Sequence, residues 1–487
     1  MPQKRAKVFF FICLLTLCDI SLASSSEKNV LFITVDDMNW DSVGKVFPNV
    51  PSLTPNIDKL AAEGMQFQYA HLTTSICQPN RAVWLTGLYP HNNGVTGFNN
   101  LNPNIETIPE LLKASGIRTG IIGKTRHSLP SRKDIWDYRI SSELLEVSRN
   151  PEQYYEYTSK FIDEAASANQ RFFLLVNIKD PHRPFAGTTS KNKEADWYKT
   201  IQNYINSILS TSSSSTIIEI DPDEITTPGF LPDLPDIREE LSSYYSSVYR
   251  ADMSVGRIMD ALSEQGLDKE TIVIFSSDNG MAFPFSKTNL YMHSTRTPLI
   301  FRNRDLTEPG RIDKDHVIAG IDIAPTILDI IGVDKGSELD GRSILPLIKG
   351  QKQAEREFVF TQFTRTKAMN DYPMRSIIGK RYGYIFNAWS DGKTEFINES
   401  QTGLTMQAMR EAAASDPQIN ERVQFFLYRT KEEFYDYEKD PDATKNLISD
   451  DGYTEIIEEY RKRLLEQMRW TKDPLFGTYE SFHADRY

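Results

Sequence analysis

Two pairs of oxygen-donating side chains stand out in the sequence, each shortly after a short apolar run. They are Asp36, Asp37, Asp278 and Asn279. The runs before them, 30–35 and 271–275, are typical of buried strands. Ligands of open α/β sheets bind beyond the carboxyl ends of such strands. An isolated Asp-Asp pair is more often a turn or a helix cap, but two pairs in this position favour a hard divalent cation. Ca²⁺ is preferred over Mg²⁺ because it tolerates irregular sets of carboxylate and amide oxygens.

A second candidate is a cysteine in a distinctive setting. Cys77-Gln78-Pro79-Asn80-Arg81 is followed by Leu85-Thr86-Gly87. Pro79 suits the first turn of a helix, so residue 77 is expected at the positive end of that helix, where anions bind. Arg81 would lie one turn further on the same face and would pair with the anion. The alternative interpretation is a buried cysteine that acts only as a small hydrophobic side chain.

Cationic side chains form the third group. Lys124 and His127 follow one predicted strand, His182 follows another, and Lys287 comes shortly after Asp278. The chain carries a net charge of −12, which argues against nucleic acid or anionic lipid as a partner. An anionic substrate would therefore need a local cluster of cations such as this one. The other five histidines keep a structural interpretation: His71, His91, His293, His316 and His483.

The cysteine motif, with its downstream Thr-Gly, resembles the modification signature of the sulfatases. In that family a formylglycine-generating enzyme oxidises the cysteine, here Cys77, to formylglycine. Its hydrated aldehyde attacks sulfur, and the second hydroxyl then expels sulfate. The resemblance implies catalytic roles for six residues, with His182 protonating the leaving atom. They are Cys77, Arg81, Lys124, His127, His182 and Lys287.

One departure concerns His127. Many sulfatases have one residue between this lysine and histidine, whereas two separate Lys124 from His127 here. Arg126 is the alternative group at that position.

Within the family, the sequence is most similar to the heparan N-sulfatases, which cleave N-sulfoglucosamine. The similar stretches are 117–124, 180–183, 283–284, 287–291, 372–376, 434–436, 440–441 and 446–447. This resemblance implies an alkaline-phosphatase-like α/β fold, with a large central sheet flanked by helices and a smaller C-terminal α+β domain. It also implies a bound Ca²⁺ and a sulfated saccharide as substrate.

The sugar pocket is where the sequence departs from this branch. Arg375, in the Tyr372-Pro373-Met374-Arg375 motif, is expected to contact the sugar. Sulfamidases carry a His-His-Glu stretch upstream, and here it is replaced by Arg365-Thr366-Lys367. This more cationic wall, with Arg365 and Lys367 at the rim, keeps a second hypothesis open: an exo-acting O-sulfatase on another sulfated polysaccharide.

Two other classes fit less well. A phosphatase or phosphodiesterase of this fold would use Ser or Thr as nucleophile and His-rich zinc sites, and the chain has 7 His in all. A non-catalytic glycan binder would lack one of the metal or nucleophile residues, and all are present.

The pattern of elements predicts how these residues are positioned. Short apolar strands alternate with helical stretches up to about Gly350, which indicates a sheet covered on both faces. We expect a signal peptide at 1–24, a catalytic domain at 28–350 and a C-terminal α+β domain at 351–487. A surface excursion is expected at 186–235. A basic start and a short apolar core predict export to a periplasmic, extracellular or lysosomal-type compartment. No stable membrane insertion is expected, and a homodimer is left open.

Overall fold

The computed structural model describes residues 28–46, 52–145, 149–186, 218–334 and 339–484. Within them, a large mixed sheet has the strand order β4-β3-β5-β1-β6-β7-β2-β8. Its strands are β1 (Asn29–Asp36), β2 (Met65–His71), β3 (Arg118–Ile122), β4 (Tyr138–Ile140), β5 (Phe172–Pro181), β6 (Thr271–Ser277), β7 (Leu299–Arg302) and β8 (Arg311–Ala319). The central strands β3, β5, β1 and β6 are mutually parallel, and β7 is antiparallel to both of its neighbours.

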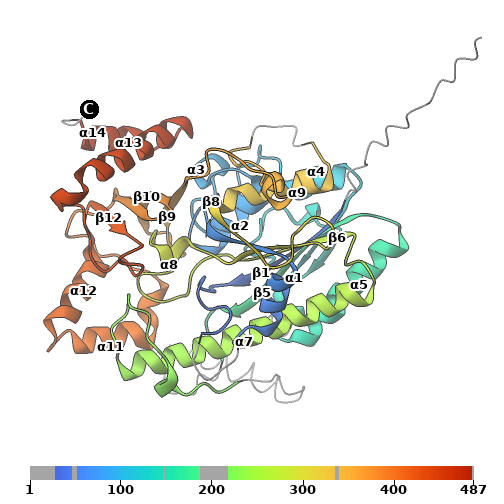
Figure 1. Cartoon of the computed structure of the whole chain (residues 1–487), viewed down its shortest axis with the longest axis horizontal. Coiled ribbons are helices and arrows are strands. Elements are labelled where there is room, and N and C mark those ends of the chain that lie inside the picture. The colour runs from blue at the N-terminus through green and yellow to red at the C-terminus, as the bar shows by residue number, and fades with distance from the viewer. Residues whose placement is uncertain (1–27, 47–51, 146–148, 187–217, 335–338, 485–487) are drawn as a thin grey trace, which may run out of the picture.

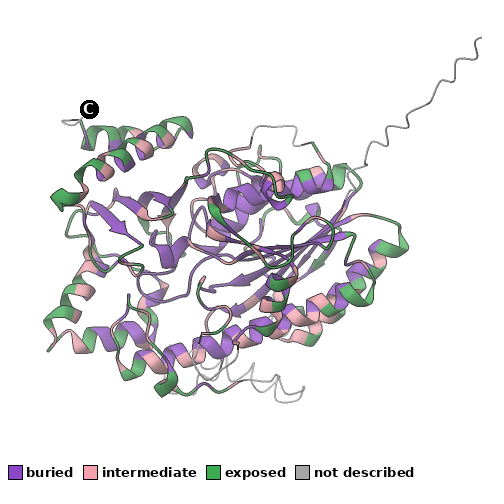
Figure 2. Ribbon diagram, in the orientation of Figure 1, coloured by how far each residue is buried: buried purple, intermediate pink, exposed green. Residues whose placement is uncertain are grey.

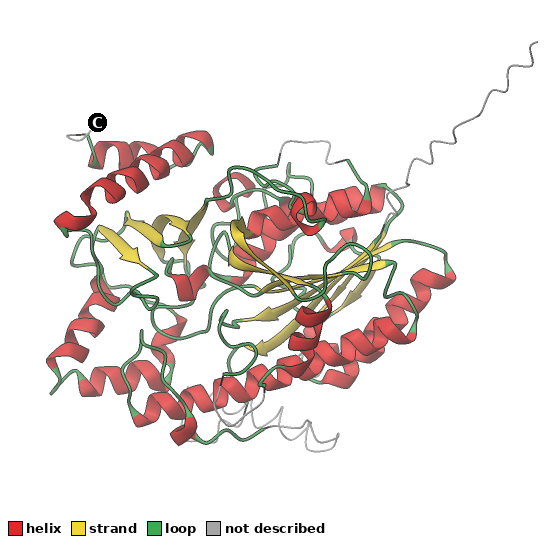
Figure 3. Cartoon of the chain, in the orientation of Figure 1, coloured by secondary structure: helices red, strands yellow, loops and turns green. Residues whose placement is uncertain are grey.

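Helices cover both faces of this sheet, as Figures 1 and 3 show. They are α1 (Pro55–Glu63), α2 (Cys77–Thr86), α3 (Pro90–Asn93), α4 (Ile108–Ala114), α5 (Pro151–Ser167), α7 (Pro235–Glu264), α8 (Met292–Thr295), α9 (Ile323–Ile331) and α10 (Leu345–Ile348). In Figure 1, α5 and the long helix α7 lie along the lower face, whereas α2, α4 and α9 lie above it. The predicted three-layer α/β arrangement is therefore confirmed.

Strand β1 shows why this arrangement buries the sheet so completely. All eight of its residues are buried, and successive side chains point to opposite faces. Leu31 and Ile33 share a hydrophobic cluster with residues of α5 and α7, whereas Val30 and Phe32 share one with residues of α2, α4 and α9. Figure 2 shows the central strands as a continuous buried layer. A strand that must be apolar on both faces appears in the sequence as an unbroken apolar run.

The C-terminal part has its own antiparallel sheet, in the order β12-β11-β10-β9. Its strands are β9 (Phe358–Arg365), β10 (Asp371–Gly379), β11 (Tyr382–Asn387) and β12 (Glu432–Asp436), and its helices are α11 (Leu404–Ala412), α12 (Pro417–Tyr428), α13 (Thr454–Trp470) and α14 (Phe476–Phe482). These elements lie beside the end of the large sheet at the left of Figure 1. The predicted smaller α+β unit is thus present.

Several expectations remain predictions. The boundary expected at 350 falls between β8 and β9, and the division into domains 28–350 and 351–487 stays a prediction. The predicted signal peptide at 1–24 lies outside the described residues, as does 187–217 of the expected surface excursion. In the part of the chain that is described, no helix is long and apolar enough to cross a bilayer.

Helix α1 begins at Pro55 with Thr54 as its N-cap residue, although the Thr54 side chain makes no capping hydrogen bond. The Thr54 hydroxyl instead accepts a hydrogen bond from the Gly44 amide at 2.7 Å and donates to Asp58.

Candidate active site

The predicted chemical groups meet at one edge of the large sheet, beyond the carboxyl ends of β3, β5, β1 and β6. Val35 pairs with Ser277 across β1 and β6, so the residues that follow these two strands are neighbours. Asp36 ends β1, and Asp278 follows directly after β6. This is the position in which open parallel sheets bind ligands.

Four oxygen-bearing side chains are fully buried at this edge: Asp36, Asp37, Asp278 and Asn279. The Asp37 amide donates to Asp278 Oδ1 at 3.2 Å, and Asn279 Nδ2 donates to Asp37 Oδ1 at 2.5 Å. Because Nδ2 donates this hydrogen bond, Asn279 Oδ1 remains available to bind a metal ion. That oxygen is buried and has no hydrogen-bond partner among the described residues.

This donor set fits a hard divalent cation. Three buried carboxylates and an amide oxygen with no partner are the ligands that Ca²⁺ and Mg²⁺ take in proteins. Burial raises the pKa of Asp37, as expected for a carboxylate in a dry site where a cation would supply the missing charge. One ligand atom each from Asp36, Asp37, Cys77 and His182 also lie within 4.8 Å of one another. The predicted metal ligands are therefore brought together.

Cys77 is the first residue of α2, with Ile76 as its N-cap, and its side chain is buried. Its Sγ lies 3.3 Å from Asp36 Oδ1, so residue 77 borders the proposed metal ligands. Burial raises the pKa of the Cys77 thiol well above its usual value. An unmodified thiol here would thus stay protonated and be a poor nucleophile.

Two lysines contact carboxylates of the predicted metal site. Lys124 follows β3 in a turn with positive φ at Gly123 and Lys124, and its ammonium group pairs with Asp36. Lys287 Nζ lies 2.8 Å from Asp37 Oδ1. Burial lowers the pKa of Lys124 to about 7. For Lys287 burial is the largest single cause and acts in the same direction, but Asp37, Cys77 and Glu399 together outweigh it and the pKa is raised.

His182 follows β5 with its ring oriented into the site. Nδ1 lies 2.7 Å from the Arg183 carbonyl oxygen, and because a carbonyl only accepts, Nδ1 carries the proton of that bond. Nε2 is then the atom that faces the carboxylates, 4.0 Å from Asp37. Burial, with Lys287 as the next cause, lowers the pKa of His182 well below its usual value, so Nε2 must first gain a proton. In that doubly protonated form, a histidine fixed in this way can deliver a proton from Nε2 to a leaving atom. The strand end that carries it is anchored by Asp180, which binds the Arg250 guanidinium at 2.6 and 2.9 Å.

His127 and its alternative, Arg126, occupy different environments. His127 is partly buried and packs edge-on against Phe98, with ring centroids 5.2 Å apart. Burial, with Lys124 as the next cause, lowers its pKa well below the usual value. Arg126 is 82% exposed and pairs with Glu143 at 3.0 Å. Of the two, His127 lies nearer the cluster.

Arg81 contacts the predicted metal ligand Asp278 and two residues of the large sheet. Its guanidinium donates to Asp278 Oδ2 at 2.9 Å, to Thr34 at 3.1 Å and to Asn177, and its side chain is 1% exposed. In this position Arg81 fixes Asp278 and balances its charge. A direct contact between Arg81 and the substrate anion stays a prediction.

The predicted sugar-binding residues lie apart from this cluster. Arg375 is 2% exposed and forms a two-point pair with Asp473 at 2.5 and 3.1 Å, so its expected contact with the sugar has no support in this position. Arg365 pairs with Asp371, and its side chain is 38% exposed; Lys367 is exposed as well.

Arg365 nevertheless borders the site. A methyl group at Gly97 would come within 2.9 Å of the Arg365 Cβ, and the next residue, Phe98, packs on His127. This chain of contacts is consistent with a rim position for the 365–367 segment.

Sequence reasoning missed Glu399 at the start of the short helix η5 (Glu399–Thr402). Its carboxylate lies 3.2 Å from Lys287 Nζ and 3.6 Å from His182 Nε2. Nothing in the local sequence marks this glutamate. Thr34 and Asn177, which hold Arg81, were also missed, although a polar side chain inside an otherwise apolar strand was a usable signal.

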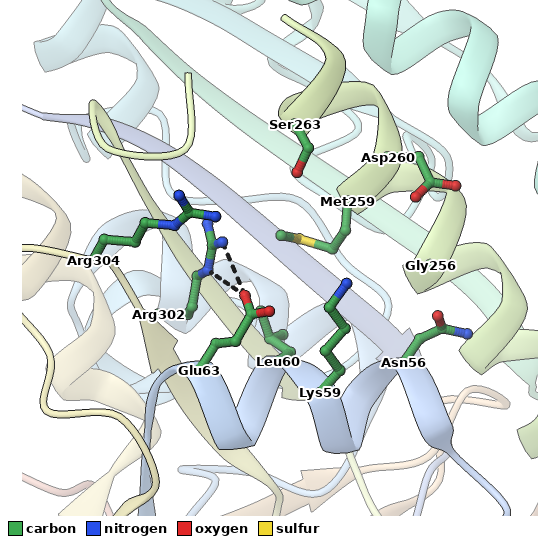
Figure 4. A pocket seen from close by; sticks show the side chains of 10 residues that line it. All are labelled: Asn56, Lys59, Leu60, Glu63, Gly256, Met259, Asp260, Ser263, Arg302 and Arg304. Carbon is green, nitrogen blue, oxygen red and sulfur yellow. Dashed lines mark hydrogen bonds and ion pairs between the residues drawn. The ribbon is translucent and has the colours of Figure 1, made fainter. Parts of the chain in front are cut away.

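A separate cavity lies at the opposite end of the sheet, between α1 and α7 (Figure 4). Lys59 and Glu63 of α1 face Met259 of α7 across it, and Arg302 binds Glu63 at 3.0 Å. Arg302 pairs with Val273 near the start of β6, away from Asp278. This cavity therefore takes no part in the cluster.

Comparison with known proteins agrees with this geometry. A family model described as sulfatase matches residues 28–333, more than half of the chain, so the chain belongs to the sulfatase family. A second model, N-sulphoglucosamine sulphohydrolase C-terminal, matches residues 281–421. The protein is accordingly a hydrolase of sulfate esters or sulfamates.

Individual relatives span almost the whole chain. It is 29% identical to human N-sulphoglucosamine sulphohydrolase, covering 95% of this chain and 94% of that protein. It is 26% identical to an ulvan-active sulfatase of Formosa agariphila, covering 90% of this chain and 74% of that protein.

Solved structures show the same fold. One, a complex with its substrate D-glucosamine-2-N,6-O-disulfate, superposes with a TM-score of 0.68 at 20% identity, covering 92% of this chain and 99% of that one. A 2-O glycosaminoglycan sulfatase gives 0.65 at 20% identity, covering 92% and 93%. The predicted alkaline-phosphatase-like fold is confirmed.

Proposed function

We propose that this sulfatase hydrolyses the N-sulfate of N-sulfoglucosamine in heparan-type glycans. The observation that carries the proposal is the match of residues 281–421 to the C-terminal model of N-sulphoglucosamine sulphohydrolase. This stretch contains Lys287 and Glu399, which both contact the cluster at the sheet edge. The similarity thus includes two residues that we expect near the leaving atom.

The proposed chemistry uses the residues as they lie. Asp36, Asp37, Asp278 and Asn279 would hold Ca²⁺, which would supply positive charge for the sulfate oxygens. Formylglycine made from Cys77 by a formylglycine-generating enzyme would supply the nucleophilic oxygen.

The chain's own basic side chains would neutralise the anion and supply the proton. The ammonium groups of Lys124 and Lys287 border the space beside Cys77 and would neutralise the anion. His182 would donate its Nε2 proton to the leaving nitrogen, while the Arg183 carbonyl keeps the imidazole ring in orientation. A sulfamate needs this proton because an amide anion is a very poor leaving group.

An O-sulfatase acting on another sulfated polysaccharide is the second candidate. Two observations favour it: the similarity to the ulvan-active sulfatase, and the cationic Arg365 and Lys367 on the partly exposed segment near His127. We further propose that a signal peptide at 1–24 exports the protein, because extracellular and lysosomal-type compartments hold such glycans.

One assay separates the two candidates. The matured enzyme is incubated with N-sulfoglucosamine and with glucosamine 6-O-sulfate, and both inorganic sulfate and new primary amine are quantified. Cleavage of an N–S bond frees one amine per sulfate, whereas cleavage of an O–S bond frees none. We expect equimolar amine and sulfate from N-sulfoglucosamine. Sulfate from the O-sulfated sugar alone would favour the second candidate.

A further inference from the structure

Glu399 comes from the C-terminal part of the chain, yet its carboxylate reaches the catalytic cluster. Oε2 lies 3.2 Å from Lys287 Nζ and Oε1 lies 3.6 Å from His182 Nε2, and the side chain is 31% exposed. It is therefore in contact with two proposed catalytic groups and still partly exposed.

The segment around Glu399 is docked firmly on the catalytic part. Asn398 Nδ2 donates to Thr288 Oγ1 at 2.7 Å, and Ser400 holds Asn398 in turn at 2.8 Å. Further along, the amide of Thr405 donates to the buried Glu240 of α7 at 2.8 Å. Glu240 also binds Arg183, the residue after His182. These contacts fix the backbone on both sides of Glu399, so the position of its carboxylate relative to His182 is set by the fold.

The carboxylate of Glu399 is an anionic acceptor. Burial would raise its pKa, but the nearby cations, Lys287 first and then Arg183 and Lys367, together outweigh burial and hold the pKa below its usual range. An ionised carboxylate has several acceptor sites and no donor. The contacts with Lys287 and His182 leave acceptor sites on the carboxylate for a hydrogen bond from the substrate.

The leaving atom of any substrate must lie within reach of His182 Nε2, since that nitrogen provides its proton. It therefore lies close to the Glu399 carboxylate as well. The two candidate leaving atoms differ here: a sulfamate nitrogen carries a hydrogen, whereas the bridging oxygen of a sulfate ester carries only lone pairs. The carboxylate can accept a hydrogen bond from the first and repels the second.

We propose that Glu399 is a specificity-determining residue that accepts a hydrogen bond from the sulfamate N–H and so favours N–S over O–S cleavage. The inference rests on the proposed function and names the group that selects its substrate class. Overall, R–NH–SO₃⁻ and water give R–NH₂ and HSO₄⁻. The N–S bond breaks and an S–O bond forms to an oxygen that water ultimately supplies. The electron pair of the broken N–S bond stays on nitrogen, which takes a proton from Nε2 of the doubly protonated His182, and the water returns a proton to His182. Glu399 accepts a hydrogen bond throughout and exchanges no proton.

The test compares Glu399→Gln with wild type on N-sulfoglucosamine and on 4-nitrophenyl sulfate. Loss of a hydrogen bond to a charged acceptor predicts a fall in kcat/KM of roughly 10- to 100-fold on the sulfamate. On the aryl sulfate ester we expect a change within about threefold or a gain, because a repulsive contact is removed. Glu395→Gln, four residues earlier and 43% exposed, is the matched control and should behave as wild type.

Equal losses on both substrates would overturn the inference, because Glu399 would then act only by positioning His182 or Lys287. No loss on either would overturn it too. If wild type releases no sulfate from N-sulfoglucosamine, the proposed function itself fails and the inference fails with it, a result distinct from both variant patterns.

Product inhibition gives a second readout that does not depend on turnover of the sulfamate by the glutamine variant. Glu399→Asp keeps the negative charge but shortens the side chain by one methylene group. Inhibition of aryl sulfate hydrolysis by glucosamine should weaken in this variant, while inhibition by inorganic sulfate should not. Equal weakening for both inhibitors would contradict a contact with the amino group.

Discussion

Arg375 offers a sharp test of how the structure reassigns a motif residue. The sequence motif suggested a contact with the sugar, whereas the structure buries Arg375 against Asp473, with side-chain exposures of 2% and 0%. Arg375 also donates to the backbone carbonyls of Phe363 and Met374. Replacing Arg375 by Ala would leave the Asp473 carboxylate buried without its main counter-ion.

The expected cost follows from that burial. Removing one partner of a buried, well-bonded ion pair destabilises a protein by about 3–5 kcal/mol. For a cooperative unit of 150–250 residues this corresponds to a fall in Tm of roughly 10 °C. Arg375→Lys should lose less, because the charge stays and only the two-point geometry is lost. Arg410→Ala is a matched control, since Arg410 is 45% exposed and lies 3.8 Å from Glu395; its effect should stay under about 1 kcal/mol.

The assay combines thermal unfolding with kinetics well below the transition. Arg375→Ala should lower Tm strongly, while kcat/KM per folded molecule stays within about twofold of wild type. An unchanged Tm together with a large rise in KM for the sugar would refute the structural role and restore the sugar contact.

Three further predictions concern the site. His182→Ala should lose far more rate on N-sulfoglucosamine than on 4-nitrophenyl sulfate, because a good leaving group needs no proton; equal losses, measured as kcat on both, would remove His182 from the acid role. Chelation should abolish turnover and added Ca²⁺ should restore it, whereas Asp278→Ala should not recover at millimolar Ca²⁺; full activity of metal-free enzyme, checked by elemental analysis, would exclude the metal site. Replacing both Arg365 and Lys367 with Ala should raise KM for a multiply sulfated oligosaccharide, and high salt should mimic that loss on wild type; an equal fall of kcat on every substrate would instead place them in the catalytic cluster.

The sequence located the centre of the site well because its signals are local. Asp36 and Asp278 each follow an apolar run, and parallel strands that are neighbours in a sheet bring such residues together. Cys77 was predicted at a helix N-terminus and is the first residue of α2.

The sequence could not predict the direction of side chains or the contacts between residues far apart in the chain. Arg81 has the predicted spacing from Cys77. Its guanidinium, however, is directed inward by hydrogen bonds to Asn177 and Thr34, which lie on strands β5 and β1. Glu399 reaches His182 only because Asn398 and Thr405 dock its segment on the catalytic part. No periodicity encodes such a contact across more than two hundred positions.

The most direct test of the proposed mechanism concerns residue 77. Protein is produced with and without a formylglycine-generating enzyme, and the peptide carrying residue 77 is quantified by mass spectrometry beside the rate of sulfate release. Conversion of a thiol to an aldehyde changes the peptide mass, so the modified fraction can be measured for each preparation. Activity should rise in proportion to the formylglycine fraction, and Cys77→Ala protein should be inactive in both preparations. Full activity in a preparation whose every molecule keeps the intact Cys77 thiol would contradict the proposed mechanism.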